Sequence, residues 1–245
     1  MLTSLAAGRL LAEVTGSTPP TVVALHGWMR TGTDFAPILA GLDAVAPNLP
    51  GASTAAEPPA EVWGSPEYAE LVADAIRPFG PVVVVAHSFG GRVAVHLAAN
   101  HPELVRGLVL TGVPLLRLQA APRQPLGFRV LRRLASLGLV SQQRLEAGRR
   151  KRGSADYIAA EGIVRDIFVR LVNEDYRETL ARVTVPVRMV WGELDSSAPA
   201  DAGLAASRLI AGSRFRVVPG AGHLLEDALT TAVRDDLFAL IEETS

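Results

Sequence analysis

The sequence has no cysteine, and a single lysine, Lys151, stands among its 245 residues. The absence of cysteine excludes disulfide bonds, thiolate metal sites and a cysteine nucleophile. No pair of the five histidines has the spacing of metal ligands. We therefore predict neither a metal site nor any other cofactor.

Long apolar runs are also lacking. The longest stretch without a charged residue, Val14 to Met29, has 16 residues and is interrupted by Pro19 and Pro20. It is too short and too broken to span a bilayer. The first nine residues hold no basic segment followed by an apolar one, which predicts that there is no secretory signal. We expect a cytoplasmic protein with no membrane partner.

The net charge is only −1 at pH 7, which argues against a nucleic-acid partner. The charge is unevenly distributed, however. From Pro114 to Gly153 there are ten basic residues and one acid, Glu146, so this segment carries +9 and the rest of the chain carries −10. The basic residues are Arg117, Arg123, Arg129, Arg132, Arg133, Arg144, Arg149, Arg150, Lys151 and Arg152.

Short β-branched runs alternate with longer amphipathic segments, which is typical of an α/β fold with a mostly parallel sheet flanked by helices. Four consecutive valines, Val82–Val85, indicate a strand buried on both faces. The predicted strands are Thr21–Leu25, Asp43–Asn48, Pro81–Ala86, Gly107–Leu110, Val185–Trp191 and Arg214–Val218, with Leu10–Val14 in an N-terminal hairpin. The predicted helices are Thr33–Ala40, Pro66–Arg77, Gly90–Asn100, Pro199–Ile210 and Asp227–Ile241.

Residues 114–183 interrupt this alternation with helical patterns alone. We predict a core formed by residues 1–113 and 184–245 and a helical insertion between them, at the carboxyl edge of the sheet where sites of α/β proteins lie. The helices expected there are Leu126–Leu137, Gln142–Lys151, Ala155–Arg165 and Ile167–Val172.

The most informative segment joins the Val82–Val85 strand to the next helix through Ala86-His87-Ser88-Phe89-Gly90. It is close to Gly-x-Ser-x-Gly, the turn that lifts a nucleophilic serine above a sheet and requires small residues on either side. Alanine at the first position departs from the strict motif but still fits. The alternative interpretation is that Ser88 merely caps the helix.

A serine nucleophile needs a base that is oriented by an acid. Two loops that follow later strands supply candidates, Glu193 and Asp195 in one and His223 in the other. We favour Asp195 over Glu193 because Glu193 lies nearer the strand end. His26-Gly27-Trp28 ends another strand at the same edge, so the backbone N–H of Trp28 is a candidate oxyanion donor beside that of Phe89.

Together these motifs resemble the α/β-hydrolase superfamily over essentially the whole chain. The resemblance implies Ser88 as nucleophile, His223 as base, Asp195 as orienting acid, and Trp28 and Phe89 as oxyanion donors. It also implies that residues 114–183 form a lid. The matching motifs are His26-Gly27, Leu49-Pro50-Gly51, the serine turn, Trp191-Gly192-x-x-Asp195 and Gly222-His223; Asn48 and Ala52 depart from the usual pattern in a structural loop.

Such a site favours hydrolysis of a carboxylic ester or thioester through an acyl-enzyme. His26-Gly27-Trp28 and Trp191-Gly192-x-Leu194-Asp195 are similar to the pimeloyl-carrier-protein methyl ester esterases, whose lid has basic residues that meet an acidic carrier protein. The alternative interpretation of the +9 segment is a solvated arginine-rich surface. Ser88-Phe89-Gly90-Gly91-Arg92 is similar to a menaquinone-pathway synthase, which leaves a C–C hydrolase or lyase as the alternative. A ligand receptor with a slow triad is a further alternative.

We expect a small-molecule acyl substrate, either anionic or carrier-bound, and the sequence does not indicate an oligomeric state. The predicted acyl pocket is apolar, with Met29 and Arg92 as substrate-binding candidates beside the oxyanion donors. Of the other histidines, His87 is expected to point away from the nucleophile, and His26 to hydrogen-bond the loop backbone.

Overall fold

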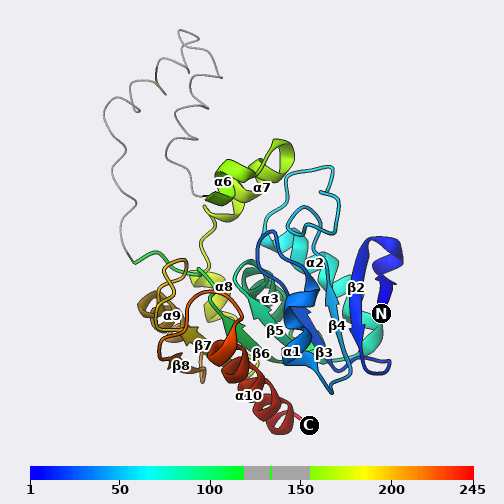
Figure 1. Ribbon diagram of the computed structural model, residues 1–245, viewed down its shortest axis with the longest axis vertical. Helices are drawn as coiled ribbons and strands as arrows, with labels where there is room; N and C mark the ends of the chain where they lie inside the picture. Colours follow the sequence, from blue (N-terminus) through cyan, green and yellow to red (C-terminus); the bar gives the residue numbers. More distant parts are fainter. Residues whose placement is uncertain (119–132, 134–154) are drawn as a thin grey trace.

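The computed structural model describes residues 1–118, 133 and 155–245. Its described part contains an eight-stranded sheet with the order β1-β2-β4-β3-β5-β6-β7-β8 (Figure 1). The pairs β1–β2 and β2–β4 are antiparallel, and every other neighbouring pair is parallel. The strands are β1 Leu2–Leu5, β2 Leu10–Thr15, β3 Val22–Leu25, β4 Ala44–Pro47, β5 Val82–His87, β6 Val105–Thr111, β7 Val187–Gly192 and β8 Arg214–Val218.

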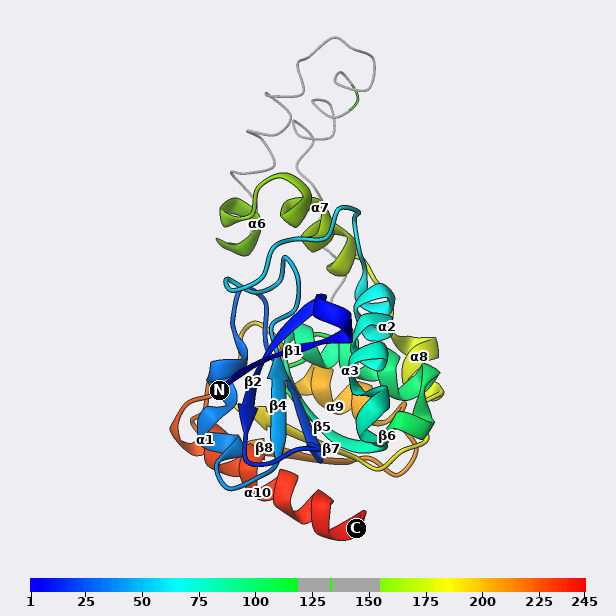
Figure 2. The same ribbon diagram turned by 90° about the vertical axis from the view of Figure 1, so that its right-hand side faces the viewer.

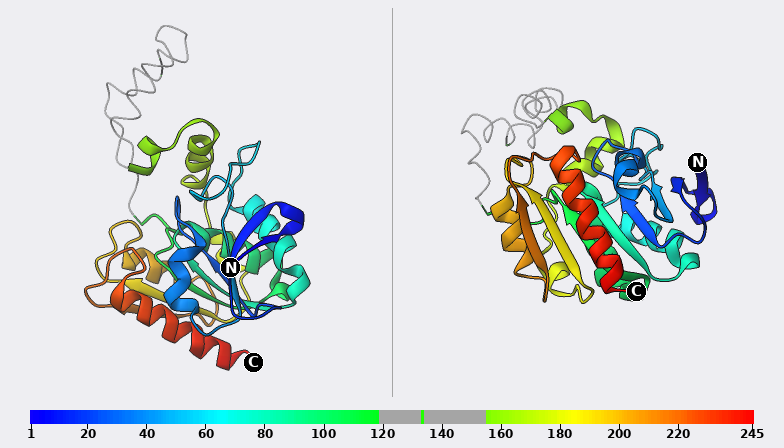
Figure 3. Two further views of the ribbon diagram at one scale, coloured as in Figure 1. Left: turned by 45° about the vertical axis from the view of Figure 1, so that its right-hand side comes forward. Right: turned by 60° about the horizontal axis from the view of Figure 1, so that its bottom comes forward.

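Helices cover both faces of the sheet. Helices α1 and α10 pack on one face, where α10 crosses the parallel strands, and α2, α3 and α9 pack on the other (Figure 3). The α-helices are α1 Ala36–Leu39, α2 Ser65–Ile76, α3 Phe89–Asn100, α6 Ala155–Ala159, α7 Gly162–Leu171, α8 Arg177–Ala181, α9 Ala200–Ser207 and α10 Asp227–Glu243. Short 3-10 turns occupy Ala6–Gly8, Gly32–Phe35, Arg77–Phe79 and Pro102–Leu104.

The valine run lies at the centre of this sandwich, as its composition predicts. Val82 and Val84 belong to the core under α2 and α3, whereas Val83 and Val85 belong to the core under α1 and α10. Each is 2% exposed or less. Burial of each side chain stabilises the fold by about 1.5–3 kcal/mol, so β5 is a rigid base for the residues that follow it.

The segment after β6 differs from its prediction. In place of helices at Ala155–Arg165 and Ile167–Val172, α6 ends at Ala159 and α7 continues without a break to Leu171. The helical conformation is interrupted between α6 and α7 by Glu161, whose backbone is extended, and by Gly162, whose φ is +52°. The apolar spacing of α7 crosses the boundary that we predicted.

Helix α8 was not predicted, because a single turn leaves little periodic signal. The predicted helices Leu126–Leu137 and Gln142–Lys151 lie outside the described residues, apart from Arg133. Helices α6 and α7 lie above the end of the sheet where the parallel strands terminate (Figure 2). The division into core and lid remains a prediction.

Candidate active site

Ser88 stands at a strained turn between β5 and α3. Its φ is +50° and its ψ −115°, a conformation that L-residues rarely adopt. The Ser88 N–H donates to the Thr111 carbonyl at 3.0 Å, and the Gly90 N–H donates to the His26 carbonyl at 3.0 Å. A Cβ on Gly90 would lie 2.2 Å from a backbone oxygen of β3, which explains the need for glycine. The Ser88 side chain makes no capping hydrogen bond to α3, so the interpretation as a helix cap is wrong.

Ser88 shares a hydrogen-bonded series with His223 and Asp195. The Oγ of Ser88 lies 3.2 Å from Nε2 of His223, and Nδ1 of His223 lies 2.8 Å from Oδ2 of Asp195. Since a carboxylate only accepts, the proton of the neutral imidazole lies on Nδ1, and Nε2 is free to accept from the hydroxyl. The structure thus brings together three residues that are 107 and 28 positions apart.

The carboxylate of Asp195 is itself held by the backbone. Its Oδ1 accepts hydrogen bonds from the N–H groups of Ser197 at 2.9 Å and Ala198 at 2.8 Å, and the residue is only 4% exposed. Glu193, the alternative acid, instead accepts from the Gly220 N–H at 2.9 Å on the surface. Asp195 is therefore the carboxylate that contacts His223.

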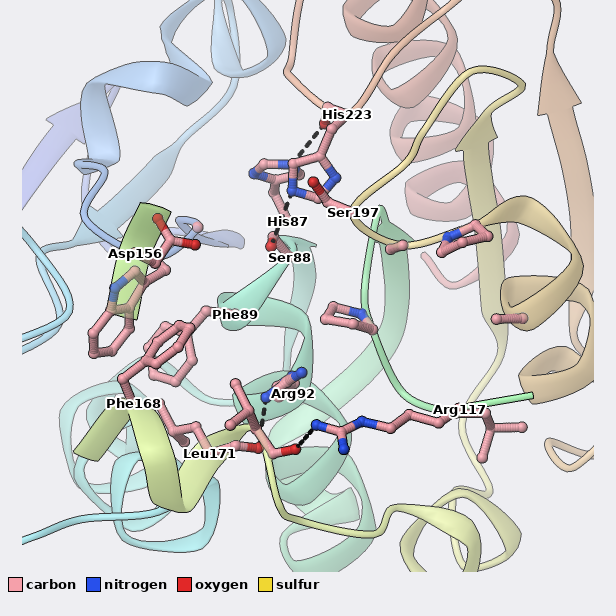
Figure 4. A pocket seen from close by; sticks show the side chains of 18 of the residues that line it. His87, Ser88, Phe89, Arg92, Arg117, Asp156, Phe168, Leu171, Ser197 and His223 are labelled. Carbon is pink, nitrogen blue, oxygen red and sulfur yellow. Dashed lines mark hydrogen bonds between the residues drawn. The ribbon is translucent and has the colours of Figure 1, made fainter. Parts of the chain in front are cut away.

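A cavity of about 800 Å³ opens beside Ser88 (Figure 4). The aromatic rings of Trp28, Phe89 and Phe168 form an apolar side, with ring centroids 5.7 Å apart for Trp28–Phe89 and 5.3 Å apart for Trp28–Phe168. Other lining residues are Gly27, Arg30, His87, Arg92, Pro114, Leu116, Arg117, Leu118, Asp156, Leu171, Val172, Ser197, Ala198, Pro199, Asp201, Ala202, His223 and Leu224. Sequence reasoning does not identify Phe168, Arg117 or Asp156 as cavity residues, although it includes Arg117 among the basic residues of the segment Pro114 to Gly153.

The two substrate-binding candidates have different outcomes. Arg92 is buried and lines the cavity, where its Nη1 donates to the Leu171 carbonyl at 2.6 Å. Met29 is not among the described lining residues; its N–H is bonded to the Ala52 carbonyl at 2.7 Å and its side chain is 39% exposed. Its neighbours in the chain, Trp28 and Arg30, both line the cavity, whereas Met29 lies between them with a φ of +55°. The prediction of Met29 as a lining residue was therefore wrong.

Two histidines beside the site are buried and neutral. Nε2 of His26 accepts from the Leu49 N–H at 2.9 Å while its Nδ1–H donates to the Gly27 carbonyl at 2.7 Å, which is the loop role that the sequence predicted. Burial lowers the pKa of His26 to about 4. His87 was expected to point away, but its ring lines the cavity 4.8 Å from that of His223. Burial likewise lowers the pKa of His87 to about 4.

Two negative findings concern the described residues only. They contain no group of three or more histidine, cysteine or acidic residues placed to hold a metal ion. None of their helices has the length and apolar character needed to cross a membrane.

Comparison with known proteins identifies a family that matches this chain and several similar proteins. A sequence profile of the alpha/beta hydrolase family matches residues 22–234. The pimeloyl-[acyl-carrier protein] methyl ester esterase of Neisseria meningitidis serogroup C is 29% identical over 228 residues, which cover 82% of this chain and 86% of that protein. Lipase LipV of Mycobacterium tuberculosis is 71% identical over 31 residues, 13% of this chain and 12% of that protein.

Among solved structures, a thermophilic esterase from Thermogutta terrifontis aligns with a TM-score of 0.69 and 19% identity, over 100% of this chain and 99% of that chain. A likeness at this identity shows the fold alone. With the family match, it confirms the fold class that the sequence predicted.

Proposed function

Because this chain belongs to the α/β-hydrolase family and is a carboxylic ester hydrolase, we propose that it cleaves its ester through an acyl-enzyme on Ser88. In this proposal His223 is the general base and Asp195 orients it. The observation that carries the proposal is the unbroken series of hydrogen bonds from Ser88 through His223 to Asp195 at the wall of the cavity.

The chemistry follows from the atoms that face one another. The Oγ of Ser88 attacks the ester carbonyl while Nε2 of His223 takes its proton, and Asp195 stabilises the imidazolium that forms. The same proton passes to the departing alkoxide, so the alcohol leaves and the acyl group stays on Ser88. A water molecule that His223 deprotonates then releases the acid and regenerates the serine.

The negative oxygen of the tetrahedral intermediate needs donors that are already in place. The first N–H of α3, that of Phe89, follows Ser88 directly and lies at the positive end of the helix. We assign the second donor to the N–H of Trp28, which follows β3 and shares the cavity wall with Phe89. Donors fixed before the reaction stabilise the developing charge without reorganisation.

A fluorophosphonate probe tests the nucleophile directly, since it forms a covalent bond only with an activated serine. It should label the wild-type protein, and Ser88→Ala should abolish labelling and lower kcat for an aryl ester by roughly 10⁴-fold or more. Ser213→Ala, which removes a hydroxyl bonded to the Ser207 carbonyl far from the cavity, is the matched control and should behave as wild type. Labelling that persists in Ser88→Ala would refute the assignment.

For the substrate we propose an acyl ester attached to a carrier protein. Two features support this: the relatives named as pimeloyl-[acyl-carrier protein] methyl ester esterases, and the +9 charge of residues 114–153. Most of that segment lies outside the described residues, and its charge alone supports this proposal. A positive field attracts an anionic partner and raises the rate of encounter, and salt screens it over about 8–10 Å.

Charge reversal separates this substrate from a free ester. Changing Arg149 and Arg150 to Glu should raise KM for a carrier-bound ester and leave kcat nearly unchanged, because steering acts on encounter. KM for a neutral aryl ester should not change. If both substrates respond alike and neither responds to salt, the carrier-protein proposal is wrong.

A further inference from the structure

His87 makes a contact that the proposed mechanism does not use. Its Nε2 lies 2.9 Å from the backbone carbonyl oxygen of His223, and the residue is only 3% exposed. Because a carbonyl oxygen can only accept, the proton of the neutral ring lies on Nε2, and Nδ1 is unprotonated. His87, which directly precedes Ser88, therefore donates a hydrogen bond to the main chain of the proposed base (Figure 4).

The loop that carries His223 is tied to the loop after β7 at Gly220, whose N–H donates to the Glu193 carboxylate at 2.9 Å. It runs from the end of β8 to the start of α10, and a Cβ added at Gly220 or Gly222 would meet no atom within 4 Å. On one side of His223 the chain is tied by the Leu194 N–H, which donates to the Ala221 carbonyl at 2.8 Å. The bond from His87 is attached to His223 itself, the residue whose side chain must stay in register with Ser88.

We propose that His87 is a positioning residue that fixes the main chain of His223 relative to Ser88; this inference rests on the proposed role of His223 as the base. His87 and Ser88 are consecutive, and the Ser88 N–H is anchored to β6 through the Thr111 carbonyl at 3.0 Å. His87 is thus joined to Ser88 by a peptide bond and to the main chain of His223 by a hydrogen bond. It therefore helps to set the positions of both residues of the 3.2 Å contact between Ser88 and His223. A catalytic group that moves by about 1 Å can lose up to 10²-fold in rate.

The surroundings of the ring suit this role. Burial, together with the neighbouring His223 ring, lowers the pKa of His87 to about 4, although the hydrogen bond to the His223 carbonyl and the charges of Asp195 and Asp34 act in the opposite direction. The His87 ring consequently stays neutral at pH 7. A lysine or arginine could donate the same bond, but its charge would oppose formation of the imidazolium only one ring away.

The other ring nitrogen argues against a simple packing role. Nδ1 of His87 is buried, and none of the described residues gives it a hydrogen bond. It lies against Gly27, where an added Cβ would be 2.9 Å from Nδ1. Burial of an unpaired acceptor is unfavourable, so packing alone would favour an apolar ring at this position. What a phenylalanine would lack is the Nε2–H that reaches His223.

The test compares His87→Phe, which keeps an aromatic ring without a donor, with His87→Gln, whose amide nitrogen can take the place of Nε2. Kinetics on a neutral aryl ester are normalised to folded protein. We expect His87→Phe to lower kcat about tenfold or more with KM within about twofold, and His87→Gln to recover most of the loss. The downfield NMR signal of the proton between His223 and Asp195 should broaden or move in His87→Phe only. His96→Phe, on α3 and outside the cavity, is the matched control and should match wild type.

The outcomes are distinct. If His87→Phe keeps the wild-type kcat per folded molecule and an unchanged signal, the inference is wrong and His87 only packs. If His87→Phe does not fold, His87→Asn replaces it, because its amide is too short to reach the carbonyl; activity equal to that of His87→Gln then overturns the inference. Ser88→Ala is measured alongside: full activity there refutes the proposed function itself, whereas an inactive Ser88→Ala with a normal His87→Phe refutes only the positioning role.

Discussion

Mild acid should destabilise this protein through His26 and His87. In the folded state burial lowers both pKa values from 6.5 to about 4. The physical cause of the lowered pKa is clearest for His26. A proton on its Nε2 would displace the Leu49 N–H from its 2.9 Å hydrogen bond and would bury a charge at the base of the site. Between pH 6.5 and 4 the unfolded chain therefore binds protons that the folded protein does not bind. The free energy of unfolding consequently falls as the pH falls through this range.

The magnitude follows from the size of the shifts. Each pKa unit corresponds to 1.36 kcal/mol, so between pH 7 and pH 5 each histidine lowers the free energy of unfolding by about 2 kcal/mol, and both by about 4 kcal/mol. A typical domain has only about 5–15 kcal/mol in total. Burial also lowers the pKa of His96, which acts in the same direction. Carboxylates titrate mostly below this range, so the interval isolates the histidines.

Urea unfolding at pH 7 and pH 5 measures this difference. In His26→Gln, which cannot take up the proton, the difference should shrink by about 2 kcal/mol, whatever the absolute stability of the variant. Ile38→Val, which trims a fully buried core side chain and removes no titratable group, should lower stability by about 0.5–1.5 kcal/mol at both pH values and leave the difference unchanged. A wild-type loss below about 1 kcal/mol, or a His26→Gln variant with the full pH dependence, would show that the reasoning is wrong.

Three further predictions concern the site. Asp195→Asn should lower kcat about 10⁴-fold with little change in Tm, because an amide favours the wrong tautomer of His223, while Glu193→Gln should stay near wild type; the reverse order in steady-state kinetics would make Glu193 the acid. His223→Ala should lower kcat by roughly 10⁴-fold or more because it removes the proposed base, and steady-state kinetics near those of the wild type would count against that role. Gly90→Ala should abolish activity and lower Tm, because its Cβ would lie 2.2 Å from a β3 carbonyl oxygen, and a wild-type melting curve would contradict this.

Local patterns predicted much of the framework. The valines of β5 show burial on both faces because a strand between two helical layers has no solvent side. The turn around Ser88 is contiguous in sequence, so its small residue Gly90 and its place between strand and helix could be recognised directly. The loop role of His26 was also predicted correctly, because His26-Gly27 directly follows a recognisable strand.

Only the tertiary structure decided what depends on the paths of separate loops. Glu193 and Asp195 differ by two positions, and it is the turn after β7 that directs one to the surface and the other to His223. Met29 does not line the cavity, although Trp28 and Arg30 on either side of it do. The contact of His87 with His223 joins residues 136 positions apart, a distance over which a single sequence carries no pairing signal. Steric requirements between neighbours in the chain can be recognised from consecutive residues. The twist and packing of the whole sheet, in contrast, determine which loops come into contact.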